Sequence, residues 1–146
     1  HKLQKYLQIA HALENDILKD IISKVTNMHI NNMIDINHQL LRALEDNRRL
    51  QYLKLQQDFY NIYLNLSVNK ALLQIISTNR LMILRLNFHY FDQISGMESI
   101  YHDHIRIIEA FKNHSLCELK KAVKELHKNS IIRLKSLESF YYRKDY

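Results

Sequence analysis

Three of the chain's nine histidines lie in one short segment, YHDHIRIIEAFKNHS, at positions 102, 104 and 114. Imidazole nitrogens are common ligands of transition metals, so this spacing raises the question of a metal site. Side chains two positions apart on a helix point about 200° away from each other. His102 and His104 therefore cannot hold one ion together from a regular helix.

The apolar residues of this segment predict which histidine faces the protein interior. His104 falls on the same helical face as Ile107 and Ile108, whereas His102 and His114 fall outside that face. We therefore predict that His104 alone of the three points inward. A single inward histidine is more often a hydrogen-bonded core residue than a metal ligand.

Other patterns of chemically active residues give no support to an enzyme. A di-iron bundle needs two Glu-x-x-His motifs and two further carboxylates, and the nearest match is Asp35 with His38, opposite the apolar face of its segment. No glycine-rich phosphate loop or nucleophile elbow is present, and Cys117 has no evident base beside it. We expect no catalytic residues.

Composition predicts an all-α protein of a single domain. The chain has 146 residues with one glycine, no proline and abundant helix-forming residues. Its one cysteine excludes an intrachain disulfide, and no apolar run approaches the roughly 18 residues of a membrane span. The net charge of +6 comes from basic residues scattered among acidic ones, which favours solubility over a DNA-binding surface. We expect a cytoplasmic protein with no membrane contact.

The apolar periodicity predicts a compact antiparallel bundle of six or seven helices. Thr26 is expected to cap the second helix, and Ser115 with Glu118 forms a predicted capping box at the start of the last. Gly96 is expected to end the fourth helix, which starts near residue 70. That helix is apolar on most of its circumference, a pattern typical of a helix that is packed on all sides or shared with a second subunit. Its two apolar sides are Leu73, Ile76, Ile83 and Leu84, and Ile75, Met82 and Leu86.

Three stretches, taken in order, resemble a known family. They are LQIAHALENDILKDIISKVTNMHINNM with its Leu13–Glu14 pair, DFYNIYLNLSVNKAL with Phe59 ten residues before Asn69, and DHIRIIEAFKNHSLCELKKAVKELHKNS, which contains His104. Together they resemble the FCD ligand-sensing domain, the C-terminal half of FadR-like members of the GntR family of bacterial transcription regulators. The resemblance covers most of the chain and implies a FadR C-terminal-domain-like fold.

Many members of that family hold a divalent metal inside the bundle with one Asp and three His. Ungapped matching puts these four ligands at Gln56, Tyr60, His104 and Leu126, so His104 is the only family ligand position retained. The other three lack the charge and donor atoms that a transition metal needs, and His127 lies one position late. We therefore expect no metal and no other cofactor, although a divalent metal stays an alternative.

The resemblance also implies a pocket inside the bundle. An arginine that many relatives carry on the first helix corresponds to Ala10, so that carboxylate-binding group is absent here. The expected effector-binding residues are Gln56, Tyr60, Arg80 and His104. Arg80 is the expected partner of an acidic group on the effector. An equally weighted alternative is that Gln56, Tyr60 and His104 hydrogen-bond each other in a packed core that binds no ligand.

The resemblance implies that residues 1–146 form the effector-binding and dimerisation domain of a transcription regulator. Because the chain begins HKLQKY without methionine, we expect a winged-helix DNA-binding domain before His1. The expected partners are a small-molecule effector, a second copy of the chain, and DNA through that other domain. The alternatives are a TetR-type sensor domain, a helical protein-interaction module, and a metal-dependent bundle protein.

Overall fold

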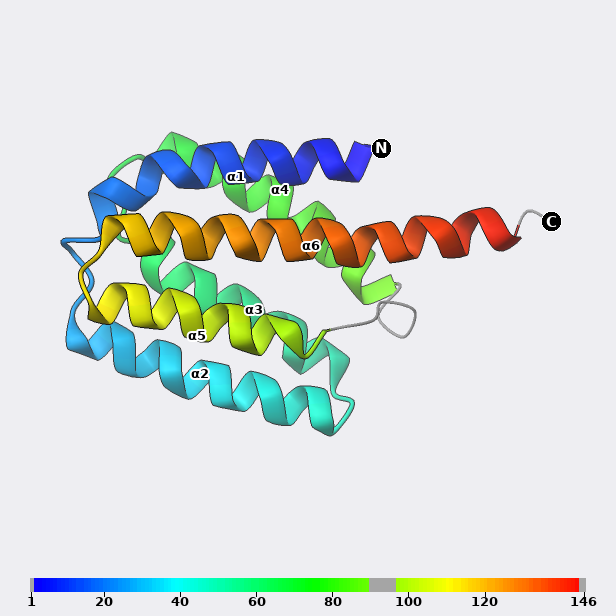
Figure 1. Cartoon of the computed structure of the whole chain (residues 1–146), viewed down its shortest axis with the longest axis horizontal. Coiled ribbons are helices and arrows are strands. Elements are labelled where there is room, and N and C mark those ends of the chain that lie inside the picture. Colours follow the sequence, from blue (N-terminus) through cyan, green and yellow to red (C-terminus); the bar gives the residue numbers. More distant parts are fainter. Residues whose placement is uncertain (1, 90–96, 145–146) are drawn as a thin grey trace.

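The computed structural model describes residues 2–89 and 97–144, and their regular structure is entirely helical (Figure 1). The predicted all-α fold is confirmed, with six helices in the described ranges. They are α1 (Lys2–Ile21), α2 (Asn27–Glu45), α3 (Arg49–Leu64), α4 (Lys70–His89), α5 (Ser99–Lys112) and α6 (Leu116–Lys144). Gly96, the predicted end of the fourth helix, lies outside the described residues. None of the described helices is long and apolar enough to cross a membrane.

Side-chain caps fix the starts of two helices. Thr26 caps α2 as predicted, because its Oγ1 accepts from the His29 N–H at 3.4 Å. The Nδ1 atom of His29 accepts in return from the Thr26 N–H at 2.9 Å, so a histidine does what a glutamate usually does in a capping box. Asn69 Oδ1 accepts from the Leu72 N–H at 3.1 Å and caps α4.

The predicted capping box of α6 is only half correct. Ser115 Oγ accepts from the Glu118 N–H at 3.1 Å, as expected. The Glu118 carboxylate instead accepts from Asn113 Nδ2 at 3.0 Å. The Ser115 N–H is already used, since it donates to the carbonyl of Ala110 at 3.1 Å in a tight turn where His114 has a φ of 49°. This turn removes the donor that the reciprocal bond needs.

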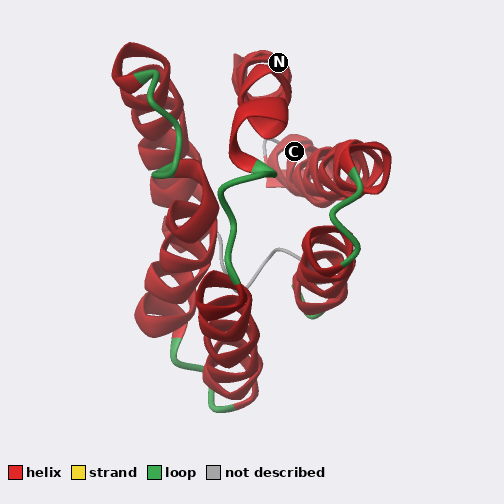
Figure 2. Cartoon of the chain, turned by 90° about the vertical axis from the view of Figure 1, so that its left-hand side faces the viewer, coloured by secondary structure: helices red, strands yellow, loops and turns green. Residues whose placement is uncertain are grey.

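The six helices form a closed ring around one interior. Each helix makes its most extensive contacts with two neighbours, in the order α1, α6, α5, α2, α3, α4 and back to α1. Figure 2 shows this ring in a view along the helices, and Figure 1 shows α1, α6, α5 and α2 lying nearly parallel or antiparallel across the front. The predicted bundle is confirmed, and side chains from every helix can reach its centre.

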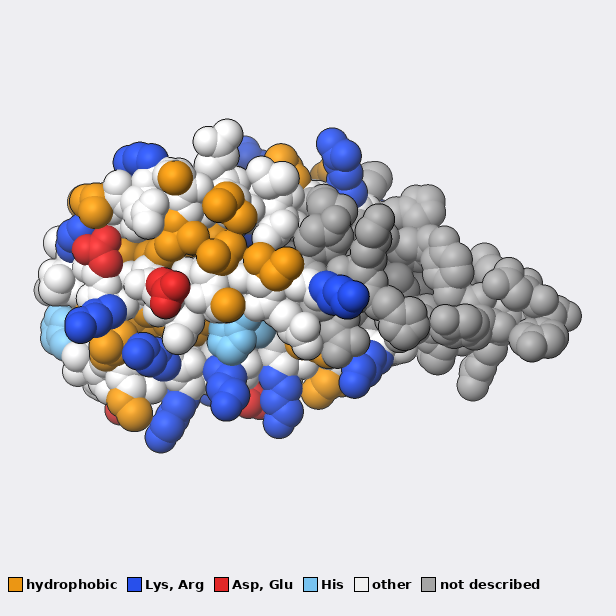
Figure 3. All heavy atoms as spheres, turned by 90° about the horizontal axis from the view of Figure 1, so that it is seen from above, with side chains coloured by type: hydrophobic (Ala, Val, Ile, Leu, Met, Phe, Trp, Pro, Cys, Tyr) orange, Lys and Arg blue, Asp and Glu red, His pale blue; other side chains and the backbone are white. Residues whose placement is uncertain are grey.

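One side of α4 faces the interior and the other faces solvent. Ile76 is buried, whereas Ile75 is 50% exposed and Leu81 is 55% exposed. The side chains of Met82, Ile83 and Leu86 lie outside the described residues. Figure 3 looks down on the α1 side of the bundle and shows hydrophobic side chains gathered in the middle of that face.

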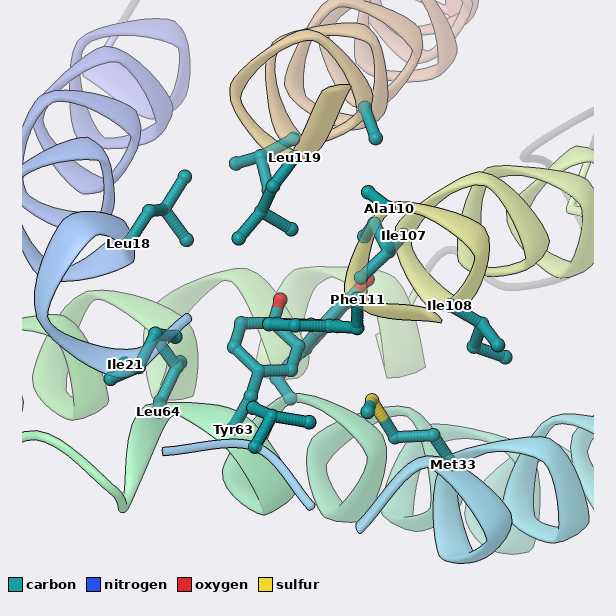
Figure 4. Close-up of a cluster of buried hydrophobic side chains, with 14 of the residues drawn as sticks. Leu18, Ile21, Met33, Tyr63, Leu64, Ile107, Ile108, Ala110, Phe111 and Leu119 are labelled. Carbon is teal, nitrogen blue, oxygen red and sulfur yellow. The ribbon is translucent and has the colours of Figure 1, made fainter. Parts of the chain in front are cut away.

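Two apolar clusters fill the bundle. The larger one takes side chains from all six helices, and Leu18, Tyr63, Phe111 and Leu119 are fully or almost fully buried in it (Figure 4). The smaller one joins α2 and α3 to the start of α5 around Tyr52, whose hydroxyl donates to the Met97 carbonyl at 3.2 Å. These clusters set the positions of the polar side chains that enter the interior.

Candidate functional site

The four residues predicted to bind an effector come together inside the ring. Gln56 and Tyr60 extend from α3, Arg80 from α4 and His104 from α5. The Tyr60 hydroxyl lies 3.0 Å from His104 Nε2 and 3.4 Å from Gln56 Nε2, and the Arg80 guanidinium carbon lies 4.0 Å from the centre of the Tyr60 ring. All four residues are buried. The mutual contacts of Gln56, Tyr60 and His104 are those of the packed-core alternative.

Local helical geometry accounts for this arrangement. Gln56 and Tyr60 are four residues apart, so both lie on one face of α3. Phe59 stacks on the His104 ring with 3.8 Å between ring centres and an interplanar angle of 5°. The Tyr60 ring meets the same imidazole edge-on at 5.2 Å and 85°. Two consecutive aromatic residues of α3 therefore hold the histidine in one orientation.

Hydrogen bonds assign the proton on His104. Burial, together with the positive charges of Arg133 and Arg80, lowers the pKa of His104 well below its usual value, so the ring is neutral. Asn37 Nδ2 donates to the Tyr101 carbonyl at 3.1 Å, which leaves Asn37 Oδ1 as an acceptor 3.0 Å from His104 Nδ1. His104 therefore carries its proton on Nδ1, and Nε2 accepts from the Tyr60 hydroxyl. Burial raises the pKa of Tyr60, which keeps that hydroxyl protonated.

A buried ion pair extends this site toward α1 and α6. Arg80 pairs with the carboxylate of Glu14, whose second oxygen accepts from His127 Nε2 at 2.8 Å. Glu14 is 1% exposed. Burial alone would raise the pKa of Glu14, but the charge of Arg80 and the hydrogen bond from His127 outweigh it and lower that pKa to about 2. Glu14 is therefore ionised at neutral pH.

Arg80 joins both groups into one polar chain through the bundle. Its members, in order, are His127, Glu14, Arg80, Tyr60, His104 and Asn37. Each of the six helices contributes one of these side chains. The links are one ion pair, one cation–π contact and hydrogen bonds, so a change at one member is felt by its neighbours.

One donor of the polar chain has no hydrogen-bond partner among the described residues. It is Arg80 Nε, which is buried. An unpaired buried donor is costly, and a carbonyl or carboxylate oxygen is the group that satisfies it. An acceptor group close to the guanidinium of Arg80 would satisfy this donor.

The four positions that the family uses for a metal do not fit a divalent cation in this chain. Both ring nitrogens of His104 are already hydrogen-bonded, and Leu126 lies in the apolar core without a donor atom. The guanidinium of Arg80 over the Tyr60 ring adds a positive charge that repels a second cation. No three His, Cys, Asp or Glu side chains in the described part of the chain are grouped as metal ligands.

Sequence reasoning missed Glu14, Asn37 and His127 as members of the interior. Each has a signal that could have found it, because each occupies a position of an apolar stripe. Glu14 follows buried Ala10 by four residues, Asn37 follows buried Met33 by four, and His127 follows buried Val123 by four. A polar residue at such a position is expected to find a buried partner.

A comparison with family models places the fold in a known group. The model of the FCD domain matches residues 6–128. Comparisons with curated proteins and with solved structures gave no match. FCD domains are the effector-binding domains of GntR-family transcription regulators, which are not enzymes. The family match covers most of the ring of helices and every member of the polar chain, and the chain therefore belongs to the FCD domain family.

Proposed function

We propose that this chain is the ligand-sensing and dimerisation domain of a FadR-type GntR regulator, with the effector bound among Gln56, Tyr60, Arg80 and His104. The observation that carries the proposal is the polar chain, to which every helix contributes one side chain. A buried ionic network is seldom more stabilising than an apolar core of the same volume. Its presence therefore favours recognition of a ligand over stability alone.

The side chains of the site favour a small, mostly apolar effector with one acidic group. Arg80 offers a guanidinium, and Gln56 and Tyr60 offer neutral hydrogen bonds. Because the family's metal positions do not fit a cation here, we propose that binding needs neither a metal nor another cofactor. No catalytic step follows from these groups, so the domain senses a molecule without converting it.

The proposed mechanism is a shift between two arrangements of the helices. An acid that pairs with Arg80 competes with Glu14, and release of Glu14 alters the links to α1 and α6. The effector favours one arrangement by its difference in affinity for the two. In the regulator, this shift would change DNA binding by a separate winged-helix domain. DNA is then a partner of that domain, and the site of action is the bacterial cytoplasm.

A second copy of the chain is the proposed partner of the exposed apolar side of α4. Ile75 and Leu81 are exposed there, and Ile9 of neighbouring α1 is 48% exposed. Sedimentation analysis of the wild type should give a dimer, and Ile75→Glu with Leu81→Glu should give a monomer. Leu50→Glu, on the exposed surface of α3, is the matched control and should leave the dimer intact. A monomeric wild type would contradict dimerisation.

Thermal unfolding in the presence of a panel of small carboxylic acids, each paired with its neutral amide, tests the effector site. An acid at about 100 times its Kd should stabilise the domain by roughly 3 kcal/mol, and its amide should do so much less. Tyr60→Phe should weaken the best acid about tenfold, since it removes one hydrogen bond near Arg80. His102→Gln, at an exposed position, is the control.

Three results would count against this site. They are stabilisation of the wild type by no member of the panel, equal stabilisation by each acid and its amide, and loss of binding after treatment with a chelator. The absence of any stabilisation would favour a helical protein-interaction module, and loss of binding after the chelator would favour a metal-dependent site.

A further inference from the structure

A groove of about 320 Å³ lies on the surface between α1 and α6, away from the proposed effector site. It is lined by His11, Ala12, Asn15, Lys120, Lys121 and Lys124. In Figure 3, several Lys and Arg side chains gather around a histidine in the lower half of the face. Three ammonium groups at one groove make a local excess of positive charge.

The three lysines of this groove have no acidic partners among the described residues. None of them forms an ion pair within 4 Å with a residue of the described chain, unlike Lys24 with Asp20 or Lys112 with Glu109. A second groove, of about 390 Å³ between α2 and α3, shows the contrast. Its lining contains two carboxylates and two guanidinium groups, those of Asp35, Asp46, Arg42 and Arg48. The unbalanced positive charge is therefore specific to the lysine groove and is not shared by every groove of this basic protein.

The lysine groove is connected to the polar chain by two histidines. His11, in the groove, stacks on His127 with 4.7 Å between ring centres and an interplanar angle of 23°. His127 donates to Glu14 at 2.8 Å, and Glu14 pairs with Arg80. A charge bound in the groove therefore lies close to His127, the α6 residue at one end of the polar chain.

We propose that this groove is a second ligand site, which binds a small organic phosphate. Lysine ammonium groups are compact point charges that suit the several oxygens of a phosphate, whereas a planar carboxylate is better matched by arginine. The phosphate lies among Lys120, Lys121 and Lys124, and the organic part lies over Ala12 with the Asn15 amide as a hydrogen-bonding partner. The volume is near the lower end of that of small-molecule sites.

Phosphate binding in the groove should be linked to protonation of His11. Burial lowers the pKa of His11, and the positive charges of His127 and Lys124 lower it further, while Glu14 opposes them. A phosphate neutralises the charge of the lysines and favours protonated His11. Binding should therefore tighten as the pH falls through the range in which His11 takes up its proton.

Calorimetric titration of the chain with inorganic pyrophosphate at an ionic strength of about 0.1 M tests the groove. The triple variant Lys120→Gln, Lys121→Gln, Lys124→Gln should bind pyrophosphate about 10- to 100-fold more weakly than the wild type. The matched control is Lys54→Gln, Lys112→Gln, Lys135→Gln, which removes the same net charge from exposed positions elsewhere. It should change the affinity no more than about threefold, because distant charges are screened. All substituted positions are exposed, and circular dichroism verifies that both variants remain folded.

A pH series and a DNA competition complete the test. The His11→Asn variant should lose the tightening at lower pH that the wild type shows, and His102→Gln, at an exposed position outside the groove, should retain it. Equal weakening by the two triple variants, or no measurable binding by the wild type, would overturn the proposal. The proposal would also be overturned if the wild type bound short duplex DNA far more tightly than pyrophosphate and the DNA displaced the pyrophosphate. That result would favour a nucleic-acid surface.

Discussion

Removal of the charge on Glu14 is expected to destabilise the domain strongly. Glu14 is 1% exposed and faces Arg80 and His127, so Glu14→Gln leaves a buried guanidinium without its counter-charge. The fall in the pKa of Glu14, from an ordinary 4.5 to about 2, corresponds to about 3 kcal/mol of stability at neutral pH. Loss of one partner of a buried pair costs a similar amount, roughly 3 to 5 kcal/mol.

Urea unfolding at two pH values measures this effect. At pH 7 the midpoint of Glu14→Gln should lie below that of the wild type by about 1.5 M, for an m value near 2 kcal/mol/M. The folded state holds the Glu14 carboxylate ionised, so its contribution is complete above pH 4.5 and is lost as the pH falls toward 2. Because glutamine resembles a protonated glutamic acid, the wild type and the variant should converge in that range.

A matched control separates this pair from carboxylates at the surface. Asp20 lies on the same helix and pairs with Lys24 at 2.9 Å, but both side chains are more than a third exposed. Asp20→Asn should therefore leave the midpoint almost unchanged. The reasoning would be refuted if Glu14→Gln behaved like Asp20→Asn at pH 7, or if its deficit were the same at pH 3 as at pH 7.

Three further predictions concern the hydrogen bonds. Tyr60→Phe should lower stability by about 1 to 3 kcal/mol, because His104 Nε2 and the Gln56 amide lose a buried partner, and thermal unfolding should show it as a drop of roughly 2 to 4 °C per kcal/mol. Below pH 6.5 His104 binds a proton in the unfolded chain but stays neutral when buried in the folded state. Stability should therefore fall by up to about 1.4 kcal/mol per pH unit from this group, and the urea midpoints of His104→Gln should depend less on pH. Ser115→Ala should lower the free energy of unfolding by about 1 kcal/mol, since it removes the cap of α6. In the same denaturation assay Glu118→Ala should lower it by less than half of that, and equal losses would support the reciprocal capping box.

Much of the fold followed from the spacing of apolar residues. The inward position of His104 and the Thr26 cap depend on neighbours within one or two helical turns, which the sequence displays directly. The Glu14–His127 bond joins residues 113 positions apart, and no local pattern reveals such a partner. A glutamate within an apolar stripe suggests burial, but its counter-charge becomes known only when α1, α4 and α6 are packed.

Mutual hydrogen bonds of Gln56, Tyr60 and His104 were one of the two predicted alternatives, but the links from this group to the rest of the polar chain were not predicted. Gln56, Tyr60 and His104 were located through a family resemblance, and helical spacing placed Arg80 on the inner side of its helix. Neither line of reasoning could foresee that Arg80 lies over the Tyr60 ring while it pairs with Glu14, because both contacts depend on side-chain conformations. The capping box of α6 failed for a similar reason, since the Ser115 N–H was already bonded to Ala110.

The distance along the chain between Glu14 and His127 has a consequence for the order of assembly. The chain leaves the ribosome N-terminal side first, so Glu14 emerges long before His127, the α6 residue that donates to it. Arg80 emerges between them. Until α6 arrives, the carboxylate and the guanidinium retain water, and closure of the ring waits for a contact of high sequence separation. Helix α6 therefore both covers the core and completes the electrostatic neutralisation of α1, so truncation within α6 should leave a partly open, aggregation-prone intermediate in place of a smaller folded domain.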